Sequence, residues 1–353
     1  MATLDTSRTL DIRPFHEFDE ANGLWPRGER PQAIRAAAEE FRGRFKEQGQ
    51  VQSVQTVDLV AAGYPTSFAF GGAAKGLNPF VSILNRLVIV RFEDFEGESK
   101  VLAWEPTVPE GSQEAPFYEQ LVERYGEWLS TNVFATYYNT IAEALGKCGL
   151  APEDVDYIAF DHLHVQDPRM MLGTDAQPAY YPNARMLAQR REVDTFGSLH
   201  PTQWAWYVDG GMDGVPDERV ILLDGDVEIG KGLAFISTPG HTDGNMSLCV
   251  NTPDGIWVSS ENGVAADNWH PRLSKIPGVR KWAEFFGRDV VMNSNTLEDS
   301  SDQYDSMIKE HAVADPDRRD PRWKQVFPSS ELARFKRQWP VMPTHFFGGI
   351  DYR

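Results

Sequence analysis

The segment "DHLHVQD", residues 161–167, contains residue types that bind divalent metal ions in proteins. His162 and His164 are two positions apart, so on a strand, or on the loop that leaves it, their side chains can point to the same side. An isolated pair of this kind also occurs among ordinary polar residues at strand ends. His241 follows a Pro-Gly turn in "STPGHTDGNMSL", which places a third imidazole at the end of another predicted strand. Three histidines at strand ends suit a first-row divalent metal ion.

The elements that would position these histidines are short strands separated by turns. From Val51 onward, short β-branched and aromatic runs alternate with Gly, Pro and Asn, which is typical of strands. Residues 220–263 contain several such runs with Gly-Asp, Pro-Gly and Pro-Asp-Gly turns at close intervals, which predicts an antiparallel meander. The sequence "WPVMPTHF" predicts one more short strand, which would end at His345. The histidines would then lie where these strands end.

The first 50 residues differ from the rest of the chain because they show no strand-like alternation. Apolar residues recur there at a spacing of three or four, with Pro31 near the start, which predicts an amphipathic helix: Ile34, Ala38, Phe41 and Phe45. We therefore expect an N-terminal helical extension over residues 1–50 and one domain over residues 51–353, with a helical insertion at about 265–340. The extension could cap the domain or exchange with a second copy, which would form a homodimer.

The composition limits the classes of partner. The chain has 353 residues, of which 41% are hydrophobic, enough for a substantial core. Its net charge of −18 repels phosphate backbones and anionic lipid headgroups, so we expect a small-molecule substrate and neither nucleic acid nor membrane as partner.

No leader-like apolar stretch and no spanning segment is visible, which predicts a cytoplasmic protein. Cys148 and Cys249 are too few for a disulfide framework and are expected to be buried.

Four segments, in their order and spacing, resemble the metal-binding segments of the metallo-β-lactamase superfamily. They are "APEDVDYIAFDHLHVQD", "DGDVEIGKGLAFISTPGHTDGNMSL", "VSSENG" and "MPTHF". The stretch around His241 is most similar to the lactonase and esterase branches. The resemblance implies an α+β fold, a four-layer αββα sandwich with the metal site at one end of the two sheets.

The resemblance also implies a set of metal ligands. The first metal position would be formed by His162, His164 and His241. The family motif His-x-His-x-Asp-His is altered here, because Gln166 and Asp167 replace its last two residues. The second position would then be formed by Asp167, Glu261 and His345, with Gln166 either a ligand or a side chain that orients a water. The implied cofactor is one or two divalent ions, with zinc expected and iron or manganese as alternatives.

The expected chemistry follows from the charge of the site. A divalent ion held by three neutral imidazoles can lower the pKa of a bound water toward about 7, which supplies hydroxide at neutral pH. Asp167 or Glu261 would transfer a proton to the leaving group. The sequence therefore predicts a metallo-hydrolase, with an ester or lactone favoured by the resemblance. Two alternatives stay open: a diiron or dimanganese redox enzyme on the same fold, since carboxylate-rich sites suit iron, and a non-catalytic binding protein with a decayed site.

Overall fold

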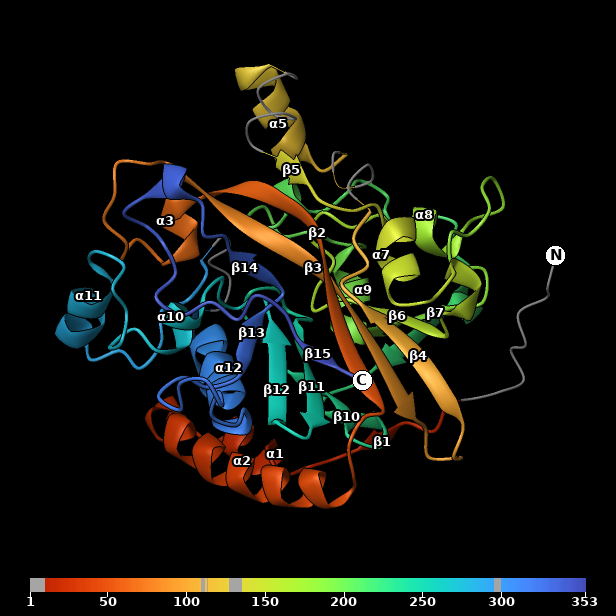
Figure 1. The fold of residues 1–353 in the computed structure, drawn as a ribbon, viewed down its shortest axis with the longest axis horizontal. Coiled ribbons are helices and arrows are strands. Elements are labelled where there is room, and N and C mark those ends of the chain that lie inside the picture. The colour runs from red at the N-terminus through yellow and green to blue at the C-terminus, as the bar shows by residue number, and fades with distance from the viewer. Residues whose placement is uncertain (1–9, 109–111, 113, 127–134, 295–299) are drawn as a thin grey trace.

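The computed structural model describes residues 10–108, 112, 114–126, 135–294 and 300–353. Two β-sheets pack face to face, and helices cover the outer face of each sheet (Figure 1). Within the described ranges, no helix combines the length and the apolar character that crossing a membrane requires. The α+β fold and its four layers, predicted from the resemblance, are confirmed.

The smaller sheet has six strands in the order β1-β9-β10-β11-β12-β13. Its strands are β1 (Arg13–Pro14), β9 (Val227–Gly230), β10 (Leu233–Ser237), β11 (Met246–Thr252), β12 (Gly255–Ser260) and β13 (Val326–Pro328). The strands β9 to β12 are antiparallel, which confirms that part of the predicted meander, and β13 is parallel to β12. Parallel neighbours end on the same side of a sheet, so the residues after β12 and β13 lie close together.

The larger sheet follows the order β15-β2-β3-β4-β6-β7-β8, with β14 paired to β3 and β5 paired to β2. Its strands are β2 (Ser53–Pro65), β3 (Phe80–Glu93), β4 (Ser99–Trp104), β5 (Ala135–Tyr137), β6 (Tyr157–Ala159), β7 (Arg185–Gln189), β8 (Val220–Leu223), β14 (Ser330–Leu332) and β15 (Asp351–Tyr352). The strand β8 was predicted as part of the meander, but it pairs in parallel with β7 in this sheet. The strands β4, β6, β7 and β8 are parallel neighbours, and the loop after β6 carries His162 and His164.

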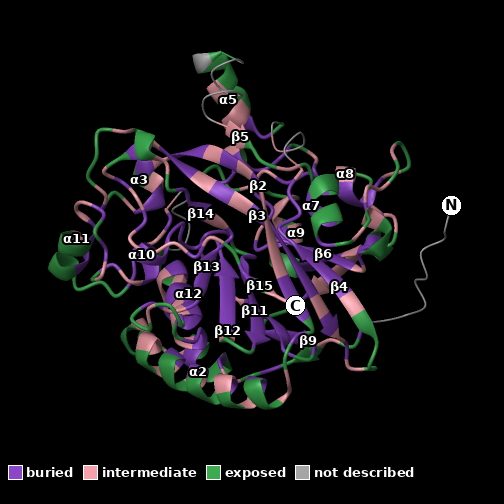
Figure 2. Cartoon of the chain, viewed as in Figure 1, coloured by how far each residue is buried: buried purple, intermediate pink, exposed green. Residues whose placement is uncertain are grey.

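Side chains alternate between two cores along the central strands, as the period of two in a strand requires. In β3, Val90 and Phe92 lie between the sheets, where they join Phe235 of β10, whereas Leu87 and Ile89 face the helices outside. Burying an aliphatic or aromatic side chain of this size contributes about 1.5–3 kcal/mol. Figure 2 shows that buried residues follow the strands and that exposed residues lie on the outer side of helices such as α2 (Arg30–Glu47).

The helices divide between the two outer layers. Those packed outside the six-stranded sheet are α1 (Asp19–Gly23), α2, α10 (Ala266–Trp269) and α12 (Ser300–Val313). Those packed outside the nine-stranded sheet are α3 (Thr66–Ala69), α7 (Ile141–Lys147), α8 (Pro168–Leu172) and α11 (Val279–Phe286). The helix α5 (Pro116–Tyr125) packs on the segment before β8, where Phe117 stacks on Trp206, and α9 (Arg190–Thr195) contacts the histidine-bearing loops through Glu192.

The N-terminal segment is part of the sandwich. The predicted helix is confirmed as α2, and it buries the four predicted apolar residues against the six-stranded sheet and α12. Before it, Arg13 and Pro14 form β1, which pairs with β9. Residues 1–9 of the expected extension lie outside the described residues.

The expected helical insertion at 265–340 contains α10, α11 and α12, but also β13 and β14, one strand of each sheet. These three-residue strands are too short to produce a period in the sequence. Residues 295–299 of this range lie outside the described part of the chain. The strand predicted to end at His345 is absent from residues 341–345, because the backbone N–H of Thr344 donates to Asp267 and not to a neighbouring strand.

Candidate metal centre

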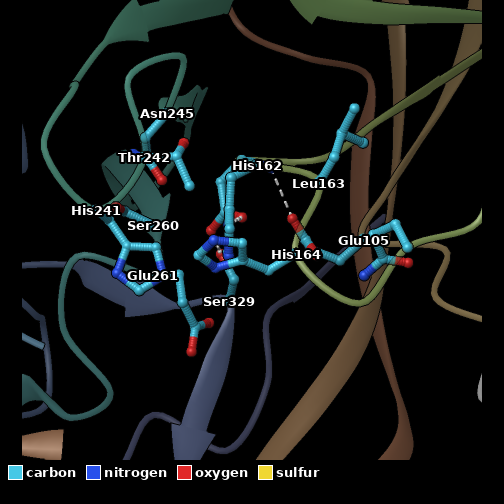
Figure 3. Close-up of polar contacts among 12 residues, drawn as sticks. Glu105, His162, Leu163, His164, His241, Thr242, Asn245, Ser260, Glu261 and Ser329 are labelled. Carbon is cyan, nitrogen blue, oxygen red and sulfur yellow. Dashed lines mark hydrogen bonds and ion pairs between the residues drawn. The ribbon is translucent and has the colours of Figure 1, made fainter. Parts of the chain in front are cut away.

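Three histidines from two loops converge at one end of the sandwich. His162 and His164 follow β6, and His241 follows β10. Their ring centroids are 4.5 Å apart for His162 and His164, 4.6 Å for His162 and His241, and 5.2 Å for His164 and His241 (Figure 3). Their ligand atoms lie within 4.8 Å of one another. Among the described residues, no other set of three His, Cys, Asp or Glu side chains lies as close together. The structure therefore brings together the three histidines of the predicted first metal position.

Hydrogen bonds hold the first two imidazole rings in defined tautomers. The Nδ1–H of His162 donates to Asp161, whose second oxygen accepts from the Ser329 hydroxyl at 2.6 Å. The Nε2–H of His164 donates to Oε1 of Gln203 at 2.5 Å. The lone pair therefore lies on Nε2 of His162 and on Nδ1 of His164, since the other nitrogen of each ring carries the proton. Partners of this kind orient the imidazoles that bind metal ions.

Glu192 of α9 connects the two histidine-bearing loops. This carboxylate is 1% exposed and accepts three hydrogen bonds. The donors are the backbone N–H of Leu163 at 2.7 Å, the hydroxyl of Tyr207 at 2.6 Å and the hydroxyl of Thr242 at 2.6 Å. Because Leu163 lies between two of the histidines and Thr242 follows the third, Glu192 fixes the distance between the loops.

A close approach of helix α12 explains the glycine before His241. Gly240 has a φ of +127°, and a Cβ atom there would lie 2.2 Å from the backbone nitrogen of Gln303. A side chain at this position would push the loop away from α12. The turn thus places His241 in a site where it is 1% exposed.

Burial keeps two of the imidazoles in their neutral, metal-binding form. Loss of solvent, together with the nearby His162 ring, lowers the pKa of His241 to about 3. The same causes, with His241 as a further neighbour, lower the pKa of His164 well below its usual range. Neutral imidazoles need not lose a proton before they bind a cation, so the site is prepared for a metal ion at neutral pH.

Three carboxyl groups lie beside the histidines in different protonation states. Burial, and then repulsion from Asp161, raises the pKa of Glu105 and that of Glu261 well above the usual range. Burial also acts to raise the pKa of Asp161, but the His162 ring and the Ser329 hydroxyl outweigh it and lower that pKa. Asp161 is therefore the ionised member, and a nearby cation would favour ionisation of the two glutamates.

The backbone is strained at two residues that line the same cavity. Glu105 and Val165 have φ values of 56° and 55°, and they are the non-glycine residues with positive φ in the described chain. This region is a genuine outlier for a β-branched residue. The surrounding structure holds it in place, since the N–H of Val165 donates to the carbonyl of Trp206 at 2.7 Å. Strain of this kind collects at functional sites.

The structure differs from the implied ligand set at Asp167 and His345, and neither residue lines the cavity. Asp167 caps α8 and pairs with the guanidinium of Arg169, at 2.8 Å and 2.9 Å. Nε2 of His345 lies 2.7 Å from a carboxylate oxygen of Asp317, and the ring stacks on Trp323. The motif places Asp167 near the histidines in sequence, but the turn at residue 165 and the cap of α8 direct its side chain elsewhere.

Glu261 and Gln166 do reach the cavity that the histidines line. Gln166 is 5% exposed, and its Nε2 donates to Thr107 at 3.0 Å. Its Oε1 is buried and has no hydrogen-bond partner among the described residues. An acceptor in this condition is suited to a water or a ligand group inside the cavity.

Sequence reasoning missed the residues that follow β13. Since β12 and β13 are parallel neighbours, Glu261 after β12 lies beside Ser329 and Ser330 after β13. Ser330 hydrogen-bonds to the Glu261 carboxyl group through its side chain and its backbone. The short run "VFP" before two serines was the signal available, but it lies within a charged stretch. Asp161, Glu192 and Gln203 were also missed, because buried polar partners have no spacing pattern.

The cavity beside the histidines has a volume of about 600 Å³. Its apolar wall comes mainly from β2, β3, α5 and the loop before β8, with Val60, Ile83, Tyr118, Leu121, Val122 and Trp206. Its described lining contains four carboxyl side chains, Glu105, Glu119, Glu123 and Glu261, and no lysine or arginine. The site thus combines an apolar chamber, a cluster of three imidazoles and an acidic rim.

Comparison with known sequences finds no matching protein-family model. Curated relatives are N-acyl homoserine lactonases. One from a Bacillus species is 30% identical over 112 residues, which is 32% of this chain and 39% of the relative. One from Bacillus thuringiensis subsp. kurstaki is 24% identical over 169 residues, which is 42% of this chain and 62% of the relative. The chain thus matches less than two thirds of the length of either relative.

Solved structures extend the similarity to most of the chain. A quorum-quenching N-acyl homoserine lactone lactonase aligns with a TM-score of 0.52 and 15% identity, over 83% of this chain and 98% of the other. An N-acyl homoserine lactone hydrolase with the product N-hexanoyl-L-homoserine bound at its catalytic metal centre aligns with a TM-score of 0.51 and 17% identity, over 80% and 94%. At these identities the similarity is one of fold.

Proposed function

Because the chain has the fold of the metallo-β-lactamase superfamily, we propose that it is a metal-dependent hydrolase that cleaves an ester or lactone bond. The observation that carries the proposal is the convergence of three histidines at the wall of a cavity of about 600 Å³. A catalytic zinc site of three imidazoles keeps an open position for water or substrate. The similarity to N-acyl homoserine lactonases supports a carbonyl substrate.

The donor set fits a divalent ion. Two of the imidazoles are neutral because burial lowers their pKa, and two have the second ring nitrogen bonded to an acceptor. We propose His162, His164 and His241 as the ligands and zinc as the ion, with iron or manganese as alternatives. When bound, such an ion supplies a Lewis acid that lowers the pKa of a water and polarises a carbonyl group.

The residues of the chain then bind the substrate and move protons. The apolar wall receives the acyl part and excludes water, while the unpaired Oε1 of Gln166 accepts a hydrogen bond from the substrate or from a water. Glu261 is the proposed group for proton transfer to the leaving oxygen, because it lies in the cavity and burial raises its pKa well above the usual range, which favours the form that carries a proton. Asp167 has no part in this step, since it pairs with Arg169.

The charge of the lining favours some substrates over others. The two exposed glutamates of the lining, Glu119 and Glu123, and the absence of lysine or arginine among the described lining residues disfavour carboxylate and phosphate substrates. An uncharged ester or lactone with an apolar acyl chain is compatible with this lining. The curated relatives act on N-acyl homoserine lactones, so an N-acyl homoserine lactone is the first substrate to test.

The test measures hydrolysis of N-hexanoyl homoserine lactone and of an uncharged aryl ester by the zinc-loaded protein. We expect acid release that a chelator abolishes, that added zinc restores and that His241→Ala lacks. His16→Ala is the matched control, because His16 is exposed and lies outside the cluster. A fully metal-loaded protein that cleaves neither substrate class would contradict the proposal. Oxygen consumption without hydrolysis would favour the redox alternative.

A further inference from the structure

We infer that the three-histidine centre binds one divalent ion, and that the second metal position implied by the fold is closed in this chain. The inference rests on the proposed metal site but not on the reaction. It comes from the side chains that would have to hold a second ion next to the first. Each of them is either neutral, engaged in a buried contact, or located elsewhere in the fold.

Asp167 is engaged where it stands. It is 5% exposed, and both carboxylate oxygens bond to Arg169, one of them also accepting the backbone N–H that begins α8. To bind a metal ion it would have to give up both bonds to a partly buried guanidinium, which would keep only Glu114 of its described partners, at 3.4 Å, and it would leave the helix without its cap. Charge-assisted hydrogen bonds of this bidentate kind are among the stronger ones in proteins, so their loss opposes metal binding by Asp167.

Gln166 is held in the cavity as a neutral group. The bond from its Nε2 to Thr107 fixes which end of the amide faces inward, so only Oε1 is available. An amide oxygen brings no charge, and it competes poorly with water for a divalent cation. The position that carries an aspartate in the family motif therefore offers a hydrogen-bond acceptor in this chain.

The strand next to Glu261 ends without a histidine. Ser329 donates to Asp161 and Ser330 bonds to Glu261, so both serine side chains already have partners. A serine hydroxyl is a weak ligand in comparison with an imidazole or a carboxylate. His345 is bonded to Asp317 and stacked on Trp323, away from the cavity lining. Among the residues implied for the second position, Glu261 would thus be the one strong ligand left. Glu105 also lines the cavity, but it already accepts the backbone N–H of Asp161 at 2.8 Å and lies outside the cluster of ligand atoms.

The experiment counts metal ions in the intact protein. Metal-free protein is titrated with Zn²⁺ by calorimetry, and the metal retained after desalting is measured by mass spectrometry. We expect one tight equivalent, with any second equivalent bound at least about 100-fold more weakly. Two equivalents of comparable affinity would overturn the inference, and so would the absence of any tight equivalent.

Two variants make the count specific. Asp167→Asn keeps an acceptor at the helix cap and should still bind one equivalent, with a Kd within about threefold of the unmodified protein. His164→Ala should lose the tight equivalent. If Asp167→Asn lowers the stoichiometry from two to one, Asp167 is a ligand and the inference is wrong. As a second readout, Mn²⁺-loaded protein should give the electron paramagnetic resonance spectrum of isolated ions, whereas a coupled pair would contradict the inference.

These outcomes are separable from those of the proposed function. One tight equivalent without ester or lactone hydrolysis would keep the single-ion centre and refute the hydrolase. Two tight equivalents with hydrolysis would refute the single-ion centre and keep the hydrolase.

Discussion

Replacing Glu192 with glutamine should weaken metal binding although this residue does not touch the ion. The Glu192 carboxylate is 1% exposed and accepts from Leu163, Tyr207 and Thr242. Hydrogen bonds to a charged group contribute about 1.5–3 kcal/mol each and neutral ones about 1 kcal/mol, so three weakened bonds amount to about 1.5–6 kcal/mol. In addition, the new NH₂ group has to face one of three donors, so one of these contacts must rearrange.

The loss should reach the ion because Leu163 and Thr242 belong to the two loops that carry the ligands. Replacing residues that orient metal ligands typically lowers affinity by about 10- to 100-fold, which is about 1.4–2.8 kcal/mol. The assay is a Zn²⁺ titration of the metal-free variant by calorimetry, together with urea unfolding to measure the change in stability.

A matched control separates metal positioning from general damage to the fold. Asp267 is another fully buried carboxylate that accepts three hydrogen bonds, from Ser274 and from the hydroxyl and N–H of Thr344, but it does not line the cavity. Asp267→Asn should lower the free energy of unfolding to a similar extent and leave the Kd for zinc unchanged. If Glu192→Gln destabilises the protein and its Kd for zinc is also unchanged, the reasoning is wrong.

Three further outcomes are expected. His241→Ala should remove the tight metal equivalent while circular dichroism stays near that of the unmodified protein, because β10 and β11 are paired by backbone bonds; a full equivalent at unmodified affinity would contradict the ligand assignment. Val165→Gly should change the free energy of unfolding by no more than about 1 kcal/mol in urea, since relief of the positive φ offsets the added backbone entropy; a loss well above that would mean that the side chain is essential. Burial is the main cause that lowers the pKa of His270 to about 2 and that of His311 to about 4. Below the usual histidine pKa of 6.5, these two side chains therefore take up protons in the unfolded chain but not in the folded chain. Stability should therefore fall as pH decreases from about 6.5 toward 4, and His311→Gln should reduce that fall in thermal melts at about pH 7 and about pH 5; an equal fall in both proteins would refute this assignment.

A helix whose apolar spacing repeats over several turns could be predicted from the sequence. Contacts between polar groups far apart in the chain could not. The helix α2 and its buried face could be predicted because the apolar spacing of three or four residues repeats over several turns, at Ile34, Ala38, Phe41 and Phe45. The spacing of two residues also predicted that the side chains of His162 and His164 would point to the same side. It could not be extended to Asp167, since the chain turns at a residue with a φ of 55°.

The other half of the site depends on pairing between segments far apart in the chain. The strand β13 is three residues long and pairs with β12, 68 residues earlier in the chain, with Val258 opposite Val326. Nothing in a three-residue run indicates its partner, so Ser329 and Ser330 could not be assigned to the site. The resemblance implies His345 as the last ligand because this histidine follows a short apolar run near the end of the chain, but a short run does not show that its side chain would bond to Asp317.

The short strand β1 has a consequence for the behaviour of the protein in solution. It is the edge strand of the six-stranded sheet, and its Pro14 has no backbone N–H that could pair with a further strand. Exposed strand edges are templates for aggregation, and proline at such an edge is a common protection. A chain that begins at Val51 would expose β9 and also the apolar surface that α2 covers, so we expect it to self-associate where the full chain stays dispersed.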